Sequence, residues 1–284
     1  MMILTSPDNT AMHLAQTIAH AASWDNTTLH LPFFTEGRHA AAVVDLTHLQ
    51  QHLRQDADVL WQQLLLSPSE LDLFTSFTFE KRYVEWLGGR IAAKYALRTL
   101  CYRNHRPQPV WSECSILPDQ VGRPTLFSAP ELACSVSISH SSRYAAALVS
   151  LDTACGLDIQ YQTDKLVRLR EKFSDVLEQQ VVIPIGNSLT GLTLIWTAKE
   201  AVKKCALSQQ PGLFHTIRVT AMESGKTSKD WTLSCSIREG SYTNTIMVSL
   251  MQWRGYLCAF CTRKHASKTH NPTSTRRRTN AGTP

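Results

Sequence analysis

Apolar side chains recur at helical spacing in two long stretches of the chain. Residues 79–100 (FEKRYVEWLGGRIAAKYALRTL) repeat them at four-residue steps, which predicts a helix, and residues 192–206 (LTLIWTAKEAVKKCA) predict a second one. Ser67, Pro68 and Glu70 form the start signal of a further helix, because a serine cap and a glutamate at the third position satisfy free backbone amides.

Short apolar runs bounded by turn residues predict strands. Three of them, CSVSIS (134–139), RYAAALVS (143–150) and CGLDIQ (155–160), are close enough in sequence to form an antiparallel meander. A helical stretch around 164–180 precedes the second long helix. Four strands are predicted after it, at HTIRVTA (215–221), WTLSCSIRE (231–239), TIMVSLMQW (245–253) and YLCAFCT (256–262).

Each half of the chain therefore combines a helix with an antiparallel meander, and we predict an α+β protein of two similar lobes packed together. The boundaries are residues 1–150 for the N-terminal lobe, 151–262 for the C-terminal lobe with the second long helix, and 263–284 for a basic tail expected to be disordered. Residues 1–66 give few firm assignments, although 39–46 fits a strand and 46–65 a helix or helix pair.

Composition narrows the class of protein. The chain has 284 residues, 43% of them apolar, which is enough for a sizeable core. No apolar run reaches the roughly 18 residues of a membrane helix, and the first residues lack a secretory signal pattern. Eight scattered cysteines suit reduced thiols in a cytoplasmic protein. For the single CxxC, Cys258 and Cys261, buried thiols are favoured over a metal or redox pair.

Charge is concentrated at the C-terminal end. Six basic residues and no acidic one follow residue 262, which equals the net charge of +6, so the rest of the chain is close to neutral. A solvated tail is the favoured interpretation. Attraction to nucleic acid or to an acidic protein is the alternative, and the tail has no interleaved aromatic residues that would support nucleic-acid binding.

Candidate chemistry lies on the second long helix and the strand before it. Strand alternation puts Asp158 and Gln160 on one side of the strand, and helical spacing puts Glu200 and Lys204 on one face of the helix. By itself the Glu200–Lys204 spacing also fits a simple surface ion pair. With Ser139, His140 and Arg123 elsewhere, the set suggests Mg²⁺ and a phosphorylated ligand, because Mg²⁺ takes one or two carboxylates plus phosphate oxygens.

Four motifs in order carry a family resemblance: GRP (122–124), SISHS (137–141), GLDIQ (156–160) and WTAKEAVKK (196–204). This set resembles the 4′-phosphopantetheinyl transferases of the Sfp type, whose usual pattern is G-K-P, S-H, G-[IV]-D-[IL]-E and W-[ST]-x-K-E-[AS]-x-x-K. The stretch RYVEWLGGRIAAKYAL resembles a helix of the enterobactin-synthesis branch, which points toward siderophore or other secondary-metabolite synthesis. The motifs span about residues 82–204.

The resemblance implies a fold and a reaction. Members are monomeric pseudo-dimers of two α/β lobes with coenzyme A (CoA) in the cleft between them. They transfer the 4′-phosphopantetheine arm of CoA to a serine of an apo acyl or peptidyl carrier protein and release adenosine 3′,5′-bisphosphate. We accordingly expect a cytoplasmic, Mg²⁺-dependent enzyme without a membrane or nucleic-acid partner. The sequence does not identify the carrier protein.

The resemblance also implies residue roles by matching position. Asp158 and Glu200 would bind Mg²⁺, Glu200 would act as general base on the acceptor serine, and Lys204 would stabilise or protonate the leaving phosphate. Contacts to CoA would come from the following residues: Ser139, His140 (to the 3′-phosphate), Arg123, Arg90, Lys94 and Lys199. For Arg90 and Lys94 a solvated helix face is the alternative, and Lys199 would support the pocket wall or face the phosphates.

Gln160 is the main departure from the family pattern, which has Glu there as a third metal ligand. An amide can offer its oxygen or order a metal-bound water, but it carries no charge, so we expect weaker Mg²⁺ binding. The alternative to an enzyme is a non-catalytic homologue that binds CoA or a carrier protein. The presence of Asp158, Glu200 and Lys204 argues against this alternative.

Overall fold

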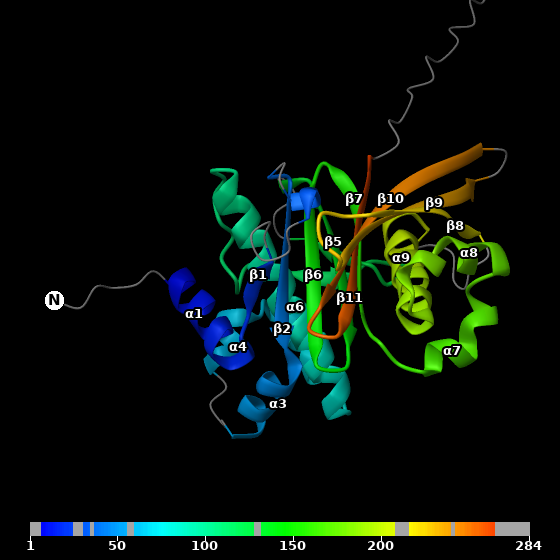
Figure 1. The fold of residues 1–284 in the computed structure, drawn as a ribbon. Coiled ribbons are helices and arrows are strands. Elements are labelled where there is room, and N and C mark those ends of the chain that lie inside the picture. The colour runs from blue at the N-terminus through cyan, green and yellow to red at the C-terminus, as the bar shows by residue number, and fades with distance from the viewer. Residues whose placement is uncertain are drawn as a thin grey trace, which may run out of the picture.

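The structure is a computed structural model that describes residues 7–24, 31–34, 37–55, 60–127, 132–207, 216–239 and 242–264. Its helices are α1 (Pro7–Ala19), α3 (Leu46–Gln55), α4 (Leu60–Leu65), α5 (Pro68–Thr75), α6 (Glu80–Arg103), α7 (Lys165–Leu169), α8 (Val176–Val181) and α9 (Ser188–Ala206), with short 3-10 segments η1 (Pro32–Phe34), η3 (Arg170–Lys172) and η4 (Ile183–Ile185). Its strands are β1 (Ala22–Trp24), β2 (His39–Asp45), β3 (Ile116–Pro118), β4 (Pro124–Leu126), β5 (Cys134–Ser141), β6 (Tyr144–Leu151), β7 (Thr153–Tyr161), β8 (Ile217–Ser224), β9 (Asp230–Glu239), β10 (Tyr242–Trp253) and β11 (Tyr256–Lys264). This mixture of helices and antiparallel strands confirms the predicted α+β class (Figure 1).

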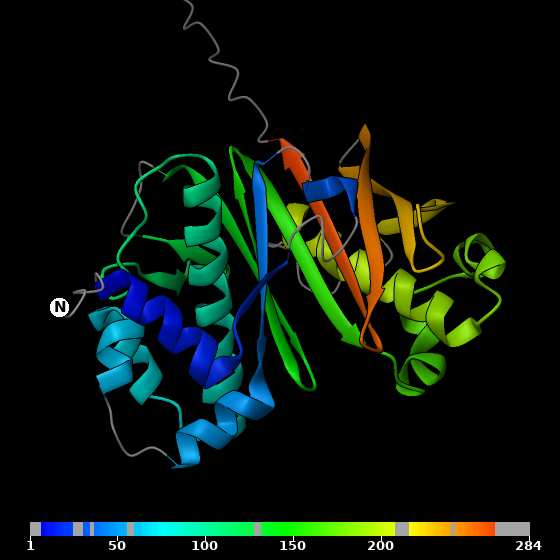
Figure 2. The ribbon, with the colours of Figure 1, turned by 60° about the vertical axis from the view of Figure 1, so that its left-hand side comes forward.

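The two larger sheets lie face to face between two long helices. The first has the strand order β1-β2-β6-β5 and the second β7-β11-β10-β9-β8. Helix α6 covers the outer face of the first sheet and α9 that of the second, so the described chain forms four layers (Figure 2). The inner faces share an apolar core that includes Trp24, Leu148 and Phe260.

This layering explains the uninterrupted apolar run in β6. Ala145 and Ala147 belong to the core under α6, whereas Ala146 and Leu148 belong to the core between the sheets. Because both faces of the strand are buried, neither face needs polar residues.

Strand β7 does not extend the sheet of β5 and β6, which corrects the predicted three-stranded meander. β6 pairs with β2 along one edge and with β5 along the other, so it has no edge left for a third strand. β7 instead pairs with β11 in the second sheet. The crossover between the sheets follows Leu151, where Asp152 adopts a left-handed conformation with φ 59°.

Two glycines allow α6 to lie close to the first sheet. A Cβ atom on Gly88 would collide with the Leu46 side chain, and one on Gly89 would lie 2.7 Å from Ile138 Cγ2. Close packing of α6 on the sheet therefore accounts for both glycines.

The N-terminal region has more structure than its sequence pattern predicts. Residues 39–46 include strand β2, and 46–65 hold the helix pair α3 and α4, as expected. The start of α5 is confirmed, because Ser67 and Glu70 form a capping box with Pro68 in the first turn. Helix α1, strand β1 and η1 lack a clear sequence signal. The Gln16 side chain of α1 donates a hydrogen bond to the Tyr95 hydroxyl of α6.

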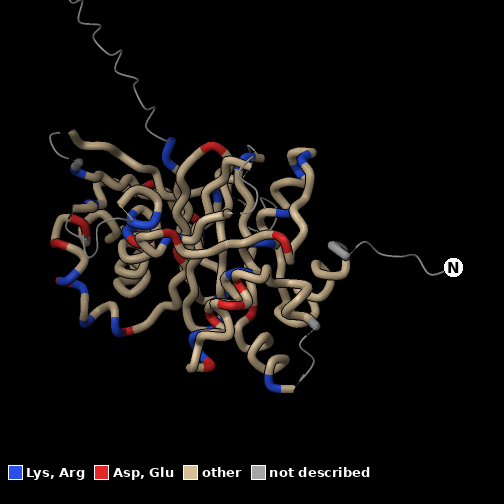
Figure 3. Tube along the Cα trace, turned by 180° about the vertical axis from the view of Figure 1, so that it is seen from behind, with Lys and Arg blue, Asp and Glu red and all other residues tan. Residues whose placement is uncertain are grey.

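The C-terminal strand continues into the predicted tail. Arg263 and Lys264, assigned to the tail, are the last residues of β11 and pair with Ala154 and Thr153; the remaining tail lies outside the described residues. Cys258 and Cys261 are buried free thiols. Acidic and basic residues are interspersed over the described chain (Figure 3).

No single helix in the described segments is long and apolar enough to cross a membrane. One pair, Val176–Ile185 with Ser188–Ala206, meets the length and composition criteria together, with a bend of 120° between its parts.

Candidate active site

The candidate residues converge where α9 packs on β7. Gly156, Asp158 and Gln160 alternate along the face of β7 that meets this helix. A Cβ atom on Gly156 would collide with the Ala201 carbonyl oxygen and lie 2.9 Å from Cys205 Cβ. Glycine at this position therefore lets the helix backbone approach the strand closely.

Lys204 joins the helix to the strand. Its Nζ lies 2.8 Å from Asp158 Oδ1 and donates a second hydrogen bond to the Leu157 carbonyl oxygen at 3.0 Å. Asp158 is 6% exposed, so its charge is buried together with a compensating ammonium.

Ser139 approaches the same carboxylate from the first sheet. Its hydroxyl donates to Asp158 Oδ1 at 2.7 Å and accepts a hydrogen bond from the Ile159 amide at 3.3 Å. The contact links β5 to β7 across the boundary between the sheets.

Glu200 lies one turn before Lys204 on α9. Burial raises the pKa of the Glu200 carboxyl above its ordinary value, and the charge of Asp158 raises it further, whereas Lys204 and Lys203 lower it. The effect of Asp158 on Glu200 is the repulsion between two nearby carboxylates. The Glu200 side chain is 19% exposed, so it is accessible to a ligand.

Gln160 is partly exposed at the end of β7, on the same face as Asp158. Its amide nitrogen donates to the Tyr161 carbonyl oxygen at 2.9 Å. With the nitrogen engaged in this way, the amide oxygen is the atom that could serve a cation.

His140 and Arg90 line a cavity of about 190 Å³ between α6, β5 and the β3–β4 hairpin. The Arg90 guanidinium stacks on Trp86 at 4.5 Å and donates to the Ile116 carbonyl oxygen. Burial lowers the pKa of Arg90 to about 10, a value at which it is still charged near neutrality. Burial also lowers the pKa of His140, while Glu85, 3.6 Å away, opposes this effect.

Arg123 lies in the tight loop of the hairpin beside this cavity. Asp119 accepts hydrogen bonds from the Arg123 amide and Nε, and Gly122 adopts a φ of 84° that closes the turn. The Arg123 side chain is 47% exposed, so its remaining guanidinium donors face solvent.

Lys94 is buried between α6 and α5, and this placement does not fit the expected contact with CoA. It is 1% exposed, and Nζ donates to the Glu70 carboxylate and to the Leu65 and Trp111 carbonyl oxygens. The three protons of the ammonium are therefore used internally. The alternative of a solvated face is also wrong for Lys94, and for Arg90, which is 9% exposed.

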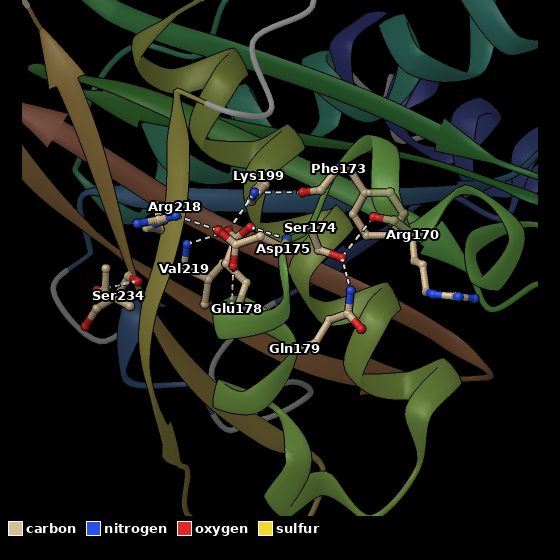
Figure 4. A network of polar contacts seen from close by, with 11 residues as sticks. Arg170, Phe173, Ser174, Asp175, Glu178, Gln179, Lys199, Arg218, Val219 and Ser234 are labelled. Atoms are coloured by element: carbon tan, nitrogen blue, oxygen red, sulfur yellow. Dashed lines mark hydrogen bonds and ion pairs between the residues drawn. The ribbon is translucent and has the colours of Figure 1, made fainter.

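Lys199 is likewise buried, where α9 packs against α8. Its Nζ lies 2.6 Å from Glu178 and donates to the Phe173 carbonyl oxygen (Figure 4). Glu178 also accepts hydrogen bonds from the Val219 and Asp175 amides, so it joins α8, α9 and β8. Of the two roles expected for Lys199, contact with phosphates does not fit this buried placement, and support of the pocket wall stays a prediction.

The sequence reasoning missed Arg82 and Glu85, which line the cavity with His140. A signal was available for Arg82, since Arg82, Trp86 and Arg90 repeat at four-residue steps on α6. Glu70 and Glu178, the buried partners of Lys94 and Lys199, were not predictable from the sequence. Each ion pair joins segments that are distant along the chain.

Sequence comparisons identify relatives of this chain. A holo-[acyl-carrier-protein] synthase from an Exiguobacterium species is 32% identical over 109 residues, which are 38% of this chain and 88% of that protein. The enzyme of the same name from Bacillus subtilis is 36% identical over 90 residues, or 31% of this chain and 74% of that one. No family model matches the chain.

Among solved structures, a holo-(acyl-carrier-protein) synthase from Bacillus anthracis in complex with CoA (3′,5′-ADP) aligns with a TM-score of 0.34 and 22% identity. This alignment covers 40% of this chain and 93% of that one. The family assignment rests on the sequence match to the Exiguobacterium protein, at 32% identity over 88% of its length. By this match the chain belongs to the 4′-phosphopantetheinyl transferase family, which includes the holo-[acyl-carrier-protein] synthases.

Proposed function

We propose that this protein is a 4′-phosphopantetheinyl transferase that moves the phosphopantetheine arm of CoA to a serine of an apo carrier protein. The observation that supports this most directly is the meeting of Asp158, Glu200 and Lys204 at the α9–β7 contact, in a chain of this family. The order of the four motifs favours the Sfp type within the family.

A magnesium ion fits the residues at this position. Asp158 Oδ1 already receives hydrogen bonds from Ser139 and Lys204, and no hydrogen bond from the described residues reaches Oδ2. With Asp158 Oδ2, Glu200 and the Gln160 amide oxygen, the site would hold a cation through few protein oxygens, as Mg²⁺ prefers. The described residues contain no group of three or more His, Cys, Asp or Glu side chains suited to a metal, so phosphate oxygens and water would complete the shell. When bound, the ion neutralises charge on the CoA pyrophosphate.

In the proposed reaction, Glu200 accepts the proton of the carrier serine hydroxyl, directly or through water. Its raised pKa suits a general base. The serine oxygen forms a bond to the β-phosphorus of CoA as the bond from that phosphorus to the bridging oxygen breaks. Adenosine 3′,5′-bisphosphate leaves with the electron pair, and Lys204 stabilises or protonates the departing phosphate.

The cavity beside His140 is proposed to hold the nucleotide of CoA. His140 would contact the 3′-phosphate, and Arg90 and the exposed Arg123 would contribute positive charge at its edges. Arg82, on the same wall, is a further candidate for a phosphate contact.

We also propose that the lobes, residues 1–150 and 151–262, form a pseudo-dimer with the CoA cleft between them. The two buried lysines support this proposal. Each projects from a long helix, pairs with the glutamate at the third position of a capping box, and donates to the carbonyl two residues before the cap: Lys94 to Leu65 and Lys199 to Phe173. In each case the glutamate also binds a strand amide, that of Ile116 or Val219.

The length of the match agrees with such a duplication, because 88% of the Exiguobacterium relative corresponds to only 38% of this chain. A duplicated chain would act as a monomer.

The motif resemblance also leads us to propose a cytoplasmic location and a role in siderophore or other secondary metabolism.

Mass spectrometry of carrier proteins tests the function. The purified chain is incubated with CoA, Mg²⁺ and a panel of apo acyl and peptidyl carrier proteins, with Glu200→Gln as a matched variant. We expect at least one carrier to gain the mass of one phosphopantetheine arm, and the variant to be slower by roughly 10²–10⁴-fold. CoA binding without modification of any carrier would instead support a non-catalytic binding protein.

A further inference from the structure

The backbone amides on the edge of β7 that faces β5 donate hydrogen bonds to serine side chains of β5. They do not form a backbone ladder with that strand. Ser137, Ser139 and Ser141 alternate along one face of β5. Their hydroxyl oxygens accept hydrogen bonds from the amides of Leu157, Ile159 and Tyr161, at 2.9, 3.3 and 3.0 Å respectively. The three contacts repeat with a constant separation of 20 residues, so the serines form one continuous row.

Ser139 differs from the other two members of this row. Its hydroxyl also donates to Asp158 Oδ1 at 2.7 Å. Ser139 and Asp158 are each 6% exposed, so water competes little for this hydrogen bond. The residue therefore holds a backbone amide and a carboxylate of the second sheet at the same time.

The position of this bond fixes the orientation of the carboxylate. Ser139 of β5 and Lys204 of α9 both donate to Oδ1. Two donors on one oxygen resist rotation about the Cβ–Cγ bond. They leave Oδ2 as the oxygen presented to a cation, since no described residue donates to it.

The same contact argues against a direct role of the hydroxyl at phosphate. A serine hydroxyl has one proton to donate, and phosphate oxygens near neutrality are chiefly acceptors. While the Ser139 hydroxyl donates its proton in the hydrogen bond to the Asp158 carboxylate, it has no proton to donate to a nucleotide phosphate.

We propose that Ser139 is a positioning residue, which holds Asp158 for metal binding from across the sheet boundary. This rests on the proposed function, in which Asp158 is a ligand of Mg²⁺. Outer partners that orient metal ligands typically contribute 10–100-fold to metal affinity. The metal site of the second sheet would then depend on a residue of the first.

Matched serine variants test this proposal. Ser139→Ala removes both bonds, Ser139→Thr keeps a hydroxyl, and Ser137→Ala removes the equivalent bond to a β7 amide without touching Asp158. Mg²⁺ binding is measured by calorimetry with CoA present and no carrier protein, and the KM for CoA is measured at saturating Mg²⁺. We expect Ser139→Ala to raise the Mg²⁺ dissociation constant roughly tenfold or more, with little change in the KM for CoA. Ser137→Ala should keep the wild-type constant, and Ser139→Thr should restore most of the affinity.

Two results would overturn the proposal. One is an equal loss of Mg²⁺ affinity in Ser139→Ala and Ser137→Ala, which would assign the row a purely structural role. The other is a raised KM for CoA with unchanged Mg²⁺ binding, which would make Ser139 a nucleotide contact. Thermal unfolding of both alanine variants shows whether each is folded. Because the binding measurement needs no carrier, it stays informative if wild-type protein modifies none of the carriers.

Discussion

The Lys204 ammonium lies 2.8 Å from Asp158 Oδ1, so that the last turns of α9 are fixed to β7 beside the proposed metal ligands. The same lysine also binds the Leu157 carbonyl oxygen. One residue thereby holds the geometry of the site and supplies positive charge to it.

Replacement of Lys204 by alanine should reduce kcat strongly. We expect a loss of roughly 10²–10³-fold, the usual effect of removing a donor that stabilises developing charge. Lys203→Ala is the matched control, since Lys203 lies 3.9 Å from Glu200, whereas the hydrogen bond to Asp158 comes from Lys204. Steady-state kinetics with a responsive carrier measure both variants, and similar losses in the two would count against a specific role for Lys204.

Gln160→Glu should tighten Mg²⁺ binding. The substitution adds a carboxylate on the same face of β7 as Asp158, at the position where the family usually has one. The expected result is a lower Mg²⁺ concentration at half-maximal activity. If the Mg²⁺ dependence is unchanged, position 160 does not touch the metal shell.

Loss of either buried glutamate should destabilise the fold. Glu178→Gln leaves the buried Lys199 without its carboxylate, and Glu70→Gln does the same to Lys94. We expect each variant to lower the free energy of unfolding by about 3–5 kcal/mol, as for other broken buried pairs. Urea unfolding measures this, and a loss below about 1 kcal/mol in both would show that the pairs are dispensable.

The affinity for CoA should depend on the protonation of His140. Because burial lowers the pKa of this imidazole, it gains its charge only below the pH at which an ordinary histidine does. The KM for CoA should therefore fall as the pH is lowered through this range, by a few-fold up to about tenfold, since bonds to a charged donor are stronger. Dephospho-CoA, which lacks the 3′-phosphate, and His140→Asn should both lose this dependence. Its persistence in either would remove His140 from the phosphate site.

Removal of residues 265–284 should leave transfer to the carrier intact. The cut falls after Lys264, so β11 keeps all its pairs with β7. We expect unchanged kcat and KM for CoA in the truncated chain. A clear rise in the KM for the carrier alone would instead assign the basic segment to partner binding.

The elements that the sequence predicted well are those whose pattern depends on local spacing. Helices α6 and α9 follow from apolar periodicity, and the start of α5 from Ser67 and Glu70. Strand alternation and helical spacing also give Asp158 and Lys204 a definite face each, but the ion pair between them was not predicted.

The elements that it did not predict depend on contacts between distant segments. By its sequence, β7 resembles the third strand of a meander. It joins the other sheet because both edges of β6 are already paired, with β2 and with β5. Lys94 reads like a solvated residue, because its partner Glu70 lies 24 positions away. By their spacing, the alternating serines of β5 resemble an ordinary polar face of a strand. Their hydrogen bonds to the amides of β7 depend on the contact between the two sheets.

The apolar core between the sheets has a consequence for folding. Both sheets contribute buried apolar side chains to this core, including Leu148 from the first and Phe260 from the second. Neither sheet could expose these side chains to water without a large loss of hydrophobic free energy. The protein should therefore melt in a single cooperative transition, and neither sheet with its covering helix should persist as an autonomous folding unit.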